Sequence, residues 1–444
     1  MAELKYAEDG RLLFTKEMKD EYTILLPMML PIHFTLMANS LKLEGYHVKL
    51  LTTTHRSIVD EGMKNVHNDS CYPALLVIGQ FIDALKSGEY DPDKVALLIT
   101  QTGGGCRASN YIHLLRKALQ RSGFERVPVI SLNLSGLEKN PGFKLNLTVG
   151  KRLINSLLYG DLIMLLANQC RPYEKCIGET DRLIQSWIEK LTEEYKNPAN
   201  LHYRHVHANM EQIASDFASV TLKQEKRVRV GVVGEIYIKY AALGNNQLED
   251  FLQNEGVETV VPGLLDFLIF KVDNRLEDCR IYGGNPFKRL IVSIMENFFK
   301  KKQYDLIEIV SKYPKFRAPT PFEHIKGLVN GYLGHGNKMG EGWLLTGEML
   351  ELVTTGTENV VCTQPFGCLP NHIVGKGMIR KIKENNPQAN IVSIDYDPSA
   401  TRVNQENRIK LMLANARINA EKRATESEKQ AVSVTVKPET VSAH

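Results

Sequence analysis

Apolar and polar residues are distributed along this chain in the manner of an α/β protein. Residues 22–26 and 46–51 are short apolar runs typical of buried strands, and residues 31–45 between them have apolar side chains at helical spacing. A strand, a helix and a second strand in this order predict a βαβ unit and therefore a parallel sheet. Residues 74–85 and 95–100 continue the pattern with a helix and a fully buried strand.

The same pattern returns in the second half of the chain. Helical periodicity with few strand-like runs occupies 151–226, and an apolar strand pattern begins again at Val228. We therefore predict a first α/β domain over 1–150, a helical bridging segment over 151–226 and a second α/β domain over 227–422. Residues 423–444 are rich in Ala, Thr, Glu, Ser, Lys and Val and have no periodic core, so we expect a disordered tail there.

Composition and charge narrow the class of protein. The chain has 444 residues, 43% of them hydrophobic and 24% charged, and its net charge is only +4. This weak charge, without a basic patch interleaved with aromatics, argues against nucleic acid as a main partner. The polar amino terminus does not resemble a secretory signal, and no apolar run approaches the roughly 18 residues that a membrane helix needs. We expect a cytoplasmic protein whose seven cysteines stay reduced.

Three cysteines lie at the ends of predicted elements. Cys368 follows an apolar strand run, Cys106 follows three glycines, and Cys71 precedes a predicted helix. Open α/β sheets bind ligands at the carboxyl ends of their strands, and thiolates near helix amides bind soft iron or zinc. We hypothesise that the three cysteines share one metal site. The glycine amides and Arg107 favour an iron–sulfur centre over a bare zinc ion.

The spacing of the cysteines leaves alternatives open. Compact CxxC pairs are absent from the sequence, so the three cysteines can meet only through the fold, and ordinary burial also explains them. Cys362 lies within a predicted strand, where core packing is the default, and it is retained as a candidate fourth ligand. Cys170, Cys176 and Cys279 are weaker candidates. The Gly103–Gly105 loop lacks the Gly-Lys-Ser/Thr of an ATP phosphate loop, so any nucleotide hydrolysis must occur on another protein.

Several short segments together carry a family resemblance. They are Phe14–Met18, Leu25–Met28, Asn68–Pro73, Gly103–Tyr111, Gln364–His372 and Ile394–Asp397. The chain resembles the 2-hydroxyacyl-CoA dehydratase superfamily, in particular its uncharacterised cytoplasmic branch, in which this region is often fused behind activase domains. The resemblance implies two Rossmann-like domains with parallel sheets and a [4Fe-4S] cluster in the cleft between them. Its ligands would be Cys71, Cys106 and Cys368.

The resemblance also implies a reaction and partners. In the characterised dehydratases, which are heterodimers, a separate ATP-hydrolysing activase delivers one low-potential electron, and the acyl-CoA substrate becomes a ketyl radical that loses hydroxide. Three cysteine ligands would leave one iron open to the substrate. The activase-like domain is missing from this sequence, so a partner would supply it, and pairing as a homodimer or a heterodimer stays open.

Two other functions remain as alternatives. Related reductases carry a double cubane and reduce small molecules, and their larger cysteine set would require Cys362 or other cysteines as ligands here. A non-catalytic electron-transfer or scaffold subunit would use its cluster structurally. The resemblance does not identify the substrate, and the catalytic residues stay unassigned.

Overall fold

Two parallel sheets form the frame of the fold. The computed structural model describes residues 3–67, 69–101, 105–132 and 138–435. Each sheet has four strands, in the orders β2-β1-β3-β4 and β6-β5-β7-β8. The strands are β1 (Thr23–Pro27), β2 (His47–Leu51), β3 (Val95–Thr100), β4 (Val129–Leu132), β5 (Arg229–Gly234), β6 (Glu258–Val260), β7 (Asn359–Pro365) and β8 (Asn390–Tyr396). The two halves of the chain therefore repeat one strand order.

Helices and short helical turns (labelled η) connect the strands. The first half contains α1 (Met18–Glu21), α2 (Pro31–Lys42), α3 (Arg56–Asn65), α4 (Tyr72–Lys86), η1 (Pro92–Lys94), η2 (Arg107–Asn110) and α5 (Tyr111–Arg121). The middle contains α6 (Leu147–Cys170), α7 (Glu179–Glu194), η3 (Pro198–Leu201) and α8 (Tyr203–Ser219). The second half contains α9 (Ile236–Tyr240), α10 (Ala242–Asn245), α11 (Leu248–Asn254), α12 (Leu264–Tyr282), α13 (Pro286–Ser311), α14 (Phe322–Leu328), α15 (Leu344–Thr354), η4 (Asn371–Gly375), η5 (Lys376–Met378), α16 (Ile379–Asn385) and α17 (Arg402–Thr435).

The central strands of both sheets are almost completely buried. In β3 every residue except the last is buried, and in β7 every residue except the first. Parallel strands covered on both faces by helices require such continuous apolar runs, which explains why the sequence predicts β3 clearly. In each sheet the chain winds in opposite directions from the two central strands, β1 and β3 or β5 and β7. Open α/β sheets bind ligands beside such a reversal, at the carboxyl ends of the strands.

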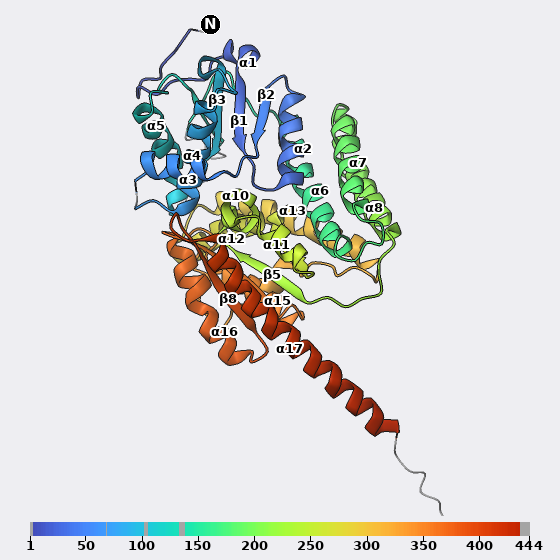
Figure 1. Cartoon of the computed structure of the whole chain (residues 1–444). Helices are drawn as coiled ribbons and strands as arrows, with labels where there is room; N and C mark the ends of the chain where they lie inside the picture. The colour runs from blue at the N-terminus through green and yellow to red at the C-terminus, as the bar shows by residue number, and fades with distance from the viewer. Residues whose placement is uncertain (1–2, 68, 102–104, 133–137, 436–444) are drawn as a thin grey trace, which may run out of the picture.

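The helical stretch predicted over 151–226 shares its core with helices of the second half. Helices α6, α7 and α8 lie to one side of the sheets (Figure 1). Their buried residues, such as Leu162 and Trp187, belong to the same hydrophobic cluster as Ile269 of α12 and Leu306 of α13. The mixed α/β architecture is as predicted, and the bridging segment packs as part of a larger helical layer.

The end of the chain differs from the sequence prediction. Helix α17 continues to Thr435, whereas we expected a structureless tail from residue 423. Buried Ile409, Met412 and Leu413 anchor the first part of this helix against the second sheet, and the following residues include Ala, Glu, Lys and Arg, which favour helix. Figure 1 shows α17 projecting away from the body of the molecule. Residues 436–444 lie outside the described part of the chain.

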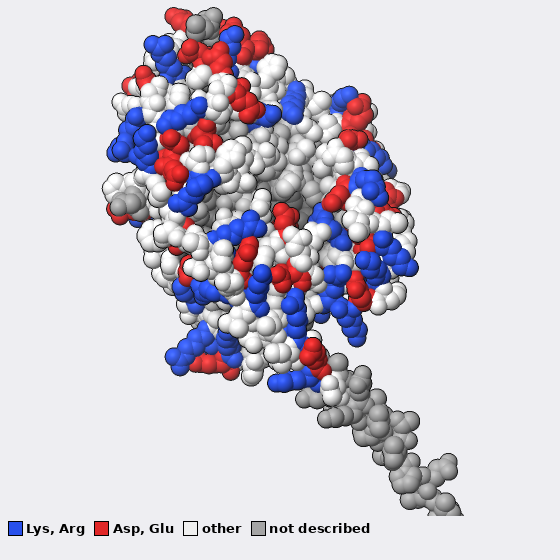
Figure 2. Space-filling view, in the orientation of Figure 1, with Lys and Arg blue, Asp and Glu red and all other residues white. Residues whose placement is uncertain are grey.

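Two features of the molecule bear on its environment, namely the charge of its surface and the length and polarity of its helices. Figure 2 shows Lys and Arg interspersed with Asp and Glu over the face in view, in keeping with the net charge of +4. Across the described ranges, each helix is too short or too polar to cross a membrane.

Candidate functional site at the strand ends

Two of the predicted ligands, Cys71 and Cys368, are brought together from opposite halves of the chain. Cys368 follows β7 closely, and Cys71 is the N-cap residue of α4. The amide of Tyr72 donates a hydrogen bond of 2.9 Å to the carbonyl of Phe366. Gly367 adopts φ +73°, and a Cβ atom there would lie 3.0 Å from the Cα of Cys71. The two loops therefore touch through their backbones.

Cys106 lies on a third loop at the same edge of the molecule. It follows β3 and is the N-cap residue of the short turn η2. A Cβ on the preceding Gly105 would lie 2.3 Å from the Sδ of Met339, so this loop also touches the second half of the chain. Gly103 and Gly104, whose amides we expected near the sulfur, lie outside the described residues, as does Asn68 beside the Cys71 loop.

The local settings of two cysteines differ from our expectation. Cys71 connects α3 to α4, so it does not sit in a strand-to-helix loop as Cys106 and Cys368 do. Ser109 donates its hydroxyl to the carbonyl of Cys106 at 2.8 Å, and Asn110 takes the N-cap position of α5. The turn η2 therefore lies between Cys106 and α5.

Tyr111 is the nearest polar neighbour of Cys71. Its hydroxyl lies 2.8 Å from the Sγ of Cys71, and Tyr111 is itself the first residue of α5. Burial raises the pKa of Cys71 to about 11, although the hydrogen bond to Tyr111 acts in the opposite direction. Burial also raises the pKa of Tyr111, and so does the negative charge of an ionised Cys71. Both groups are therefore protonated at neutral pH. If a bound cation displaces the proton of Cys71, the phenol can donate a hydrogen bond to the resulting thiolate.

Two glutamates and a lysine from the second half lie in electrostatic range of the cysteines. Glu235 follows β5 directly and caps α9, accepting from the amide of Ile238 at 2.9 Å. Glu341 accepts from the amide of Ile236 at 3.0 Å. Burial, followed by the charge of Glu341, raises the pKa of Glu235 to about 8. Lys271 of α12 donates to the carbonyl of Gly340, and burial lowers its pKa.

Charges couple these groups to the thiols. Burial raises the pKa of Cys368, and the charges of Glu341 and Glu235 raise it further. Burial also raises the pKa of Cys106, with a further increase from Glu341 and an opposing effect from Lys271. Negative charge beside the thiols and their raised pKa values both favour a bound cation at this site.

Three thiols on neighbouring loops are donors of the kind that a soft metal or an iron–sulfur cluster takes. Their present orientation does not complete a site: over residues 3–67, 69–101, 105–132 and 138–435, no group of three or more His, Cys, Asp or Glu side chains could hold a metal ion. The Sγ of Cys71 faces Tyr111 instead.

The remaining cysteines are placed elsewhere. Cys362, the candidate fourth ligand, is fully buried in a hydrophobic cluster with Val360 and Ile382, and its thiol lies 3.8 Å from the Oδ1 of Asn371. Burial raises its pKa to about 12. Cys170 is buried against the carbonyl of Phe217, and the other two, Cys176 and Cys279, are exposed and partly exposed. Core packing accounts for Cys362.

Glu235, Tyr111 and Lys271 were not predicted from the sequence as members of this site. Glu235 follows an apolar strand in the same way as Cys368, so the strand-end rule could have found it. Tyr111 ends one of the segments that carry the resemblance but had no assigned role. Lys271 had no signal, because α12 was not predicted. Comparison of the sequence with protein-family models and with curated proteins gives no match, so the site's chemistry rests on its own geometry.

Proposed function

We propose that this chain is an iron–sulfur protein resembling a component of the 2-hydroxyacyl-CoA dehydratases. Cys71, Cys106 and Cys368 would hold a [4Fe-4S] cluster between two Rossmann-like domains. The cluster would supply one-electron chemistry at low potential, with the electron delivered by an ATP-hydrolysing activase, for radical dehydration or reduction of a substrate. The observation that carries the proposal is the backbone contact between the Cys71 and Cys368 loops, with Cys106 in electrostatic range.

The surface beside Cys368 supports access by a partner or an acyl substrate. Phe366, Leu369 and Ile373 expose 55%, 68% and 55% of their surface, and Met339 exposes 49%. Large apolar side chains gathered around one site mark a binding surface more often than a solvated one. An acyl-CoA thioester is the substrate class that we propose from the resemblance.

The surrounding acids and Tyr111 would have roles of their own in this proposal. Glu235 carries a proton at neutral pH because its pKa is raised to about 8, so it can give that proton to a departing hydroxide. Tyr111 would donate its hydroxyl to the thiolate of Cys71. Lys271 would offset negative charge near Cys106.

The deciding experiment is a measurement of iron and acid-labile sulfide on protein purified without oxygen. We expect about four irons per chain and a brown colour, whereas a double cubane would give about eight. Cys71→Ser, Cys106→Ser and Cys368→Ser should each lose most of the iron, while the matched control Cys279→Ser should keep it. Colourless protein after anaerobic reconstitution would refute the proposal.

The same anaerobically purified protein can distinguish a catalytic cluster from a structural one. An open iron position exchanges with added small ligands and changes the visible or electron paramagnetic resonance spectrum, while a fully ligated cluster does not. A spectrum that is unchanged by substrate-like thioesters and by cyanide would favour an electron-transfer or scaffold subunit.

A further inference from the structure

A cavity lies away from the cysteines, between the helical layer and the edge strand β6. It has a volume of about 150 Å³. Its walls come from α6, the end of β6 and the segment after it, the first turn of α12, the second half of α13, residues 317–320, α14 and α15. Since a water molecule takes up roughly 30 Å³ in the liquid, the space suits a molecule of about five non-hydrogen atoms.

Four carboxyl groups line this cavity beside amides, hydroxyls and one guanidinium, and one of them, that of Asp161, is paired with His33 at 2.9 Å. Asp266, Glu348 and Glu351 all line it, and Asp266 and Glu348 expose only 7% and 2% of their surface. Glu348 has a partner in Lys239, whose Nζ lies 3.0 Å from its Oε1. Within the described residues, Asp266 and Glu351 have no ion-pair partner: Asp266 accepts from the amide of Gln303, and Glu351 accepts from a hydroxyl.

Hydrogen-bonding side chains face the same space without a partner. Asn168 and Thr259 line the cavity and expose only 9% and 7% of their surface. In the part of the chain that the structure describes, neither side chain makes a hydrogen bond, and neither has a fully enclosed polar atom. A polar ligand in the cavity could therefore pair with both side chains.

The electrostatics specify the sign of the ligand. Burial and the neighbouring carboxylates of Asp161, Glu348 and Glu351 raise the pKa of Asp266. Burial also raises the pKa of Glu351. Arg317, a positive side chain in the wall, is already paired with Glu258. The cavity therefore lacks the positive charge that its carboxyls would accommodate.

We propose that this cavity binds a small organic ammonium ion. The ammonium group would lie between Asp266 and Glu351 and donate to Asn168 or Thr259, while its carbon chain would pack on apolar wall residues such as Leu306 and Ile325. An inorganic cation fits less well, because over the described residues no set of three or more acidic, His or Cys side chains is arranged for a metal ion.

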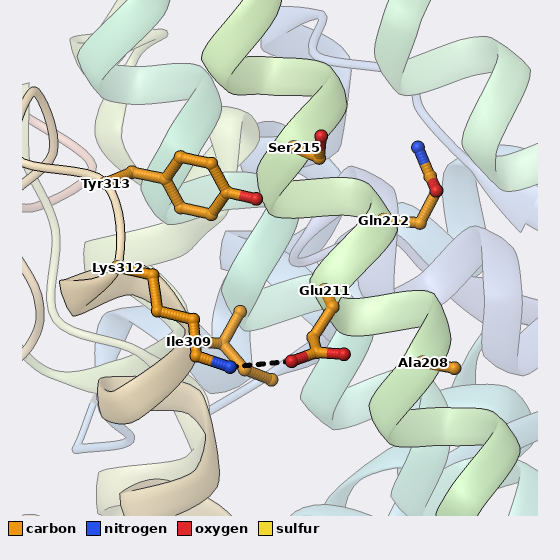
Figure 3. Close-up of a pocket in the computed structure, with 7 residues that line it drawn as sticks. All are labelled: Ala208, Glu211, Gln212, Ser215, Ile309, Lys312 and Tyr313. Carbon is orange, nitrogen blue, oxygen red and sulfur yellow. Dashed lines mark hydrogen bonds and ion pairs between the residues drawn. The ribbon is translucent and has the colours of Figure 1, made fainter.

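Another hollow, on the outer surface, does not offer an equivalent site. It has a volume of about 330 Å³ and lies on the outer surface between α8 and the end of α13 (Figure 3). Its principal charges, Glu211 and Lys312, already bind each other at 2.6 Å, as the dashed line in Figure 3 shows. Glu211 is nevertheless a useful control, because it is a carboxylate in a hollow with its own cation.

The test is isothermal titration calorimetry of the full chain with n-butylammonium at constant ionic strength. We expect saturable binding that Glu351→Gln and Asp266→Asn each weaken at least about tenfold, since each removes one charge and keeps the side-chain shape. Glu211→Gln should bind as the unaltered protein does. Thermal unfolding of each variant checks that it is folded.

Titration of the unaltered protein is enough to refute the proposal. Absence of saturable binding would refute it, even if both variants failed to fold. If n-butanol binds as tightly as n-butylammonium, the positive charge is not recognised. If potassium ion competes with n-butylammonium at equal affinity, the carbon chain is not recognised. Equal affinity in Glu351→Gln, Asp266→Asn and Glu211→Gln would place any binding elsewhere on the molecule.

Discussion

At the scale of single residues, Gly367 sets how closely the two halves of the chain approach. Its φ of +73° lies in the left-handed region, where L side chains are strained. A side chain there would also meet the Cα of Cys71 at 3.0 Å and the carbonyl of Ser70 at 3.2 Å. Backbone atoms cannot move aside cheaply, so this glycine is required twice, by its conformation and by its neighbours.

We predict that Gly367→Ala destabilises the protein by at least about 2 kcal/mol, through strain and steric overlap together. Gly88→Ala is the matched control, because Gly88 has φ +77° and an added Cβ there would have no neighbour within 4 Å. This control should cost only about 1 kcal/mol. Urea unfolding measures both. Equal losses would mean that the contact with the Cys71 loop has no energetic weight.

The site residues were predictable only where they follow an apolar strand. Cys368 was found because an uninterrupted apolar run precedes it, and Cys106 because a buried strand and glycines do. Lys271 could not be found, since its role depends on how α12 packs beside the loop of Glu341. Sequence spacing also cannot show that Cys71 turns toward Tyr111, because that contact joins residues far apart in the chain.

At the scale of elements, the buried ion pair between α9 and α15 fixes one helix against the other. Lys239 and Glu348 expose only 4% and 3% of their side chains, and the Lys239 Nζ also lies 4.7 Å from the ring of Tyr240. Removing two such charges from water costs free energy, so burial of each charge depends on the presence of the other. Burial still raises the pKa of Glu348 despite its partner.

We predict that Lys239→Met costs about 3–5 kcal/mol, because it leaves a buried carboxylate without a partner. The double variant Lys239→Met with Glu348→Leu should recover part of that loss. Lys312→Met is the control: its partner Glu211 is exposed, and the change should be barely measurable in the same urea titration. A double variant no more stable than Lys239→Met would contradict the argument.

The elements themselves were predicted unevenly, for physical reasons. The strands β1, β2, β3, β5 and β7 were visible as apolar runs bounded by polar residues. Helix α12 was missed because its buried positions include Asp266, Asp273 and Glu277, which break the apolar periodicity. The segment after Cys368 forms η4, η5 and α16 in succession. Glycines at 375 and 377 weaken a continuous helix there.

At the scale of the whole molecule, several acids of the folded chain have a raised pKa. Burial is the main cause in each case: it raises the pKa of Glu235 to about 8 and that of Glu249 to about 7. It also raises the pKa of Asp266, Glu348 and Glu351. These groups lie in the second half of the chain and in its contact with the helical layer. Among the described residues, the carboxyl groups with a raised pKa therefore belong to the second half of the chain.

The sign of the pH dependence follows from these shifts. In the unfolded chain a glutamate titrates near pH 4.5, whereas folded Glu235 holds its proton to about pH 8. Between these values the unfolded state binds fewer protons, so the free energy of unfolding falls as the pH rises, by roughly 1 kcal/mol per pH unit for each such group. The stabilisation is complete below pH 4.5 and is lost as the pH passes 8.

We predict that urea unfolding measured from pH 5 to pH 8 shows this decline and that Glu235→Gln makes it shallower. The amide oxygen of glutamine can still accept from the amide of Ile238, so the helix cap survives while the titrating group is removed. Curves of equal slope for the two proteins would show that Glu235 is ionised in the folded state. In that case the site at the strand ends would present a carboxylate, and not a proton donor, to whatever binds beside the cysteines.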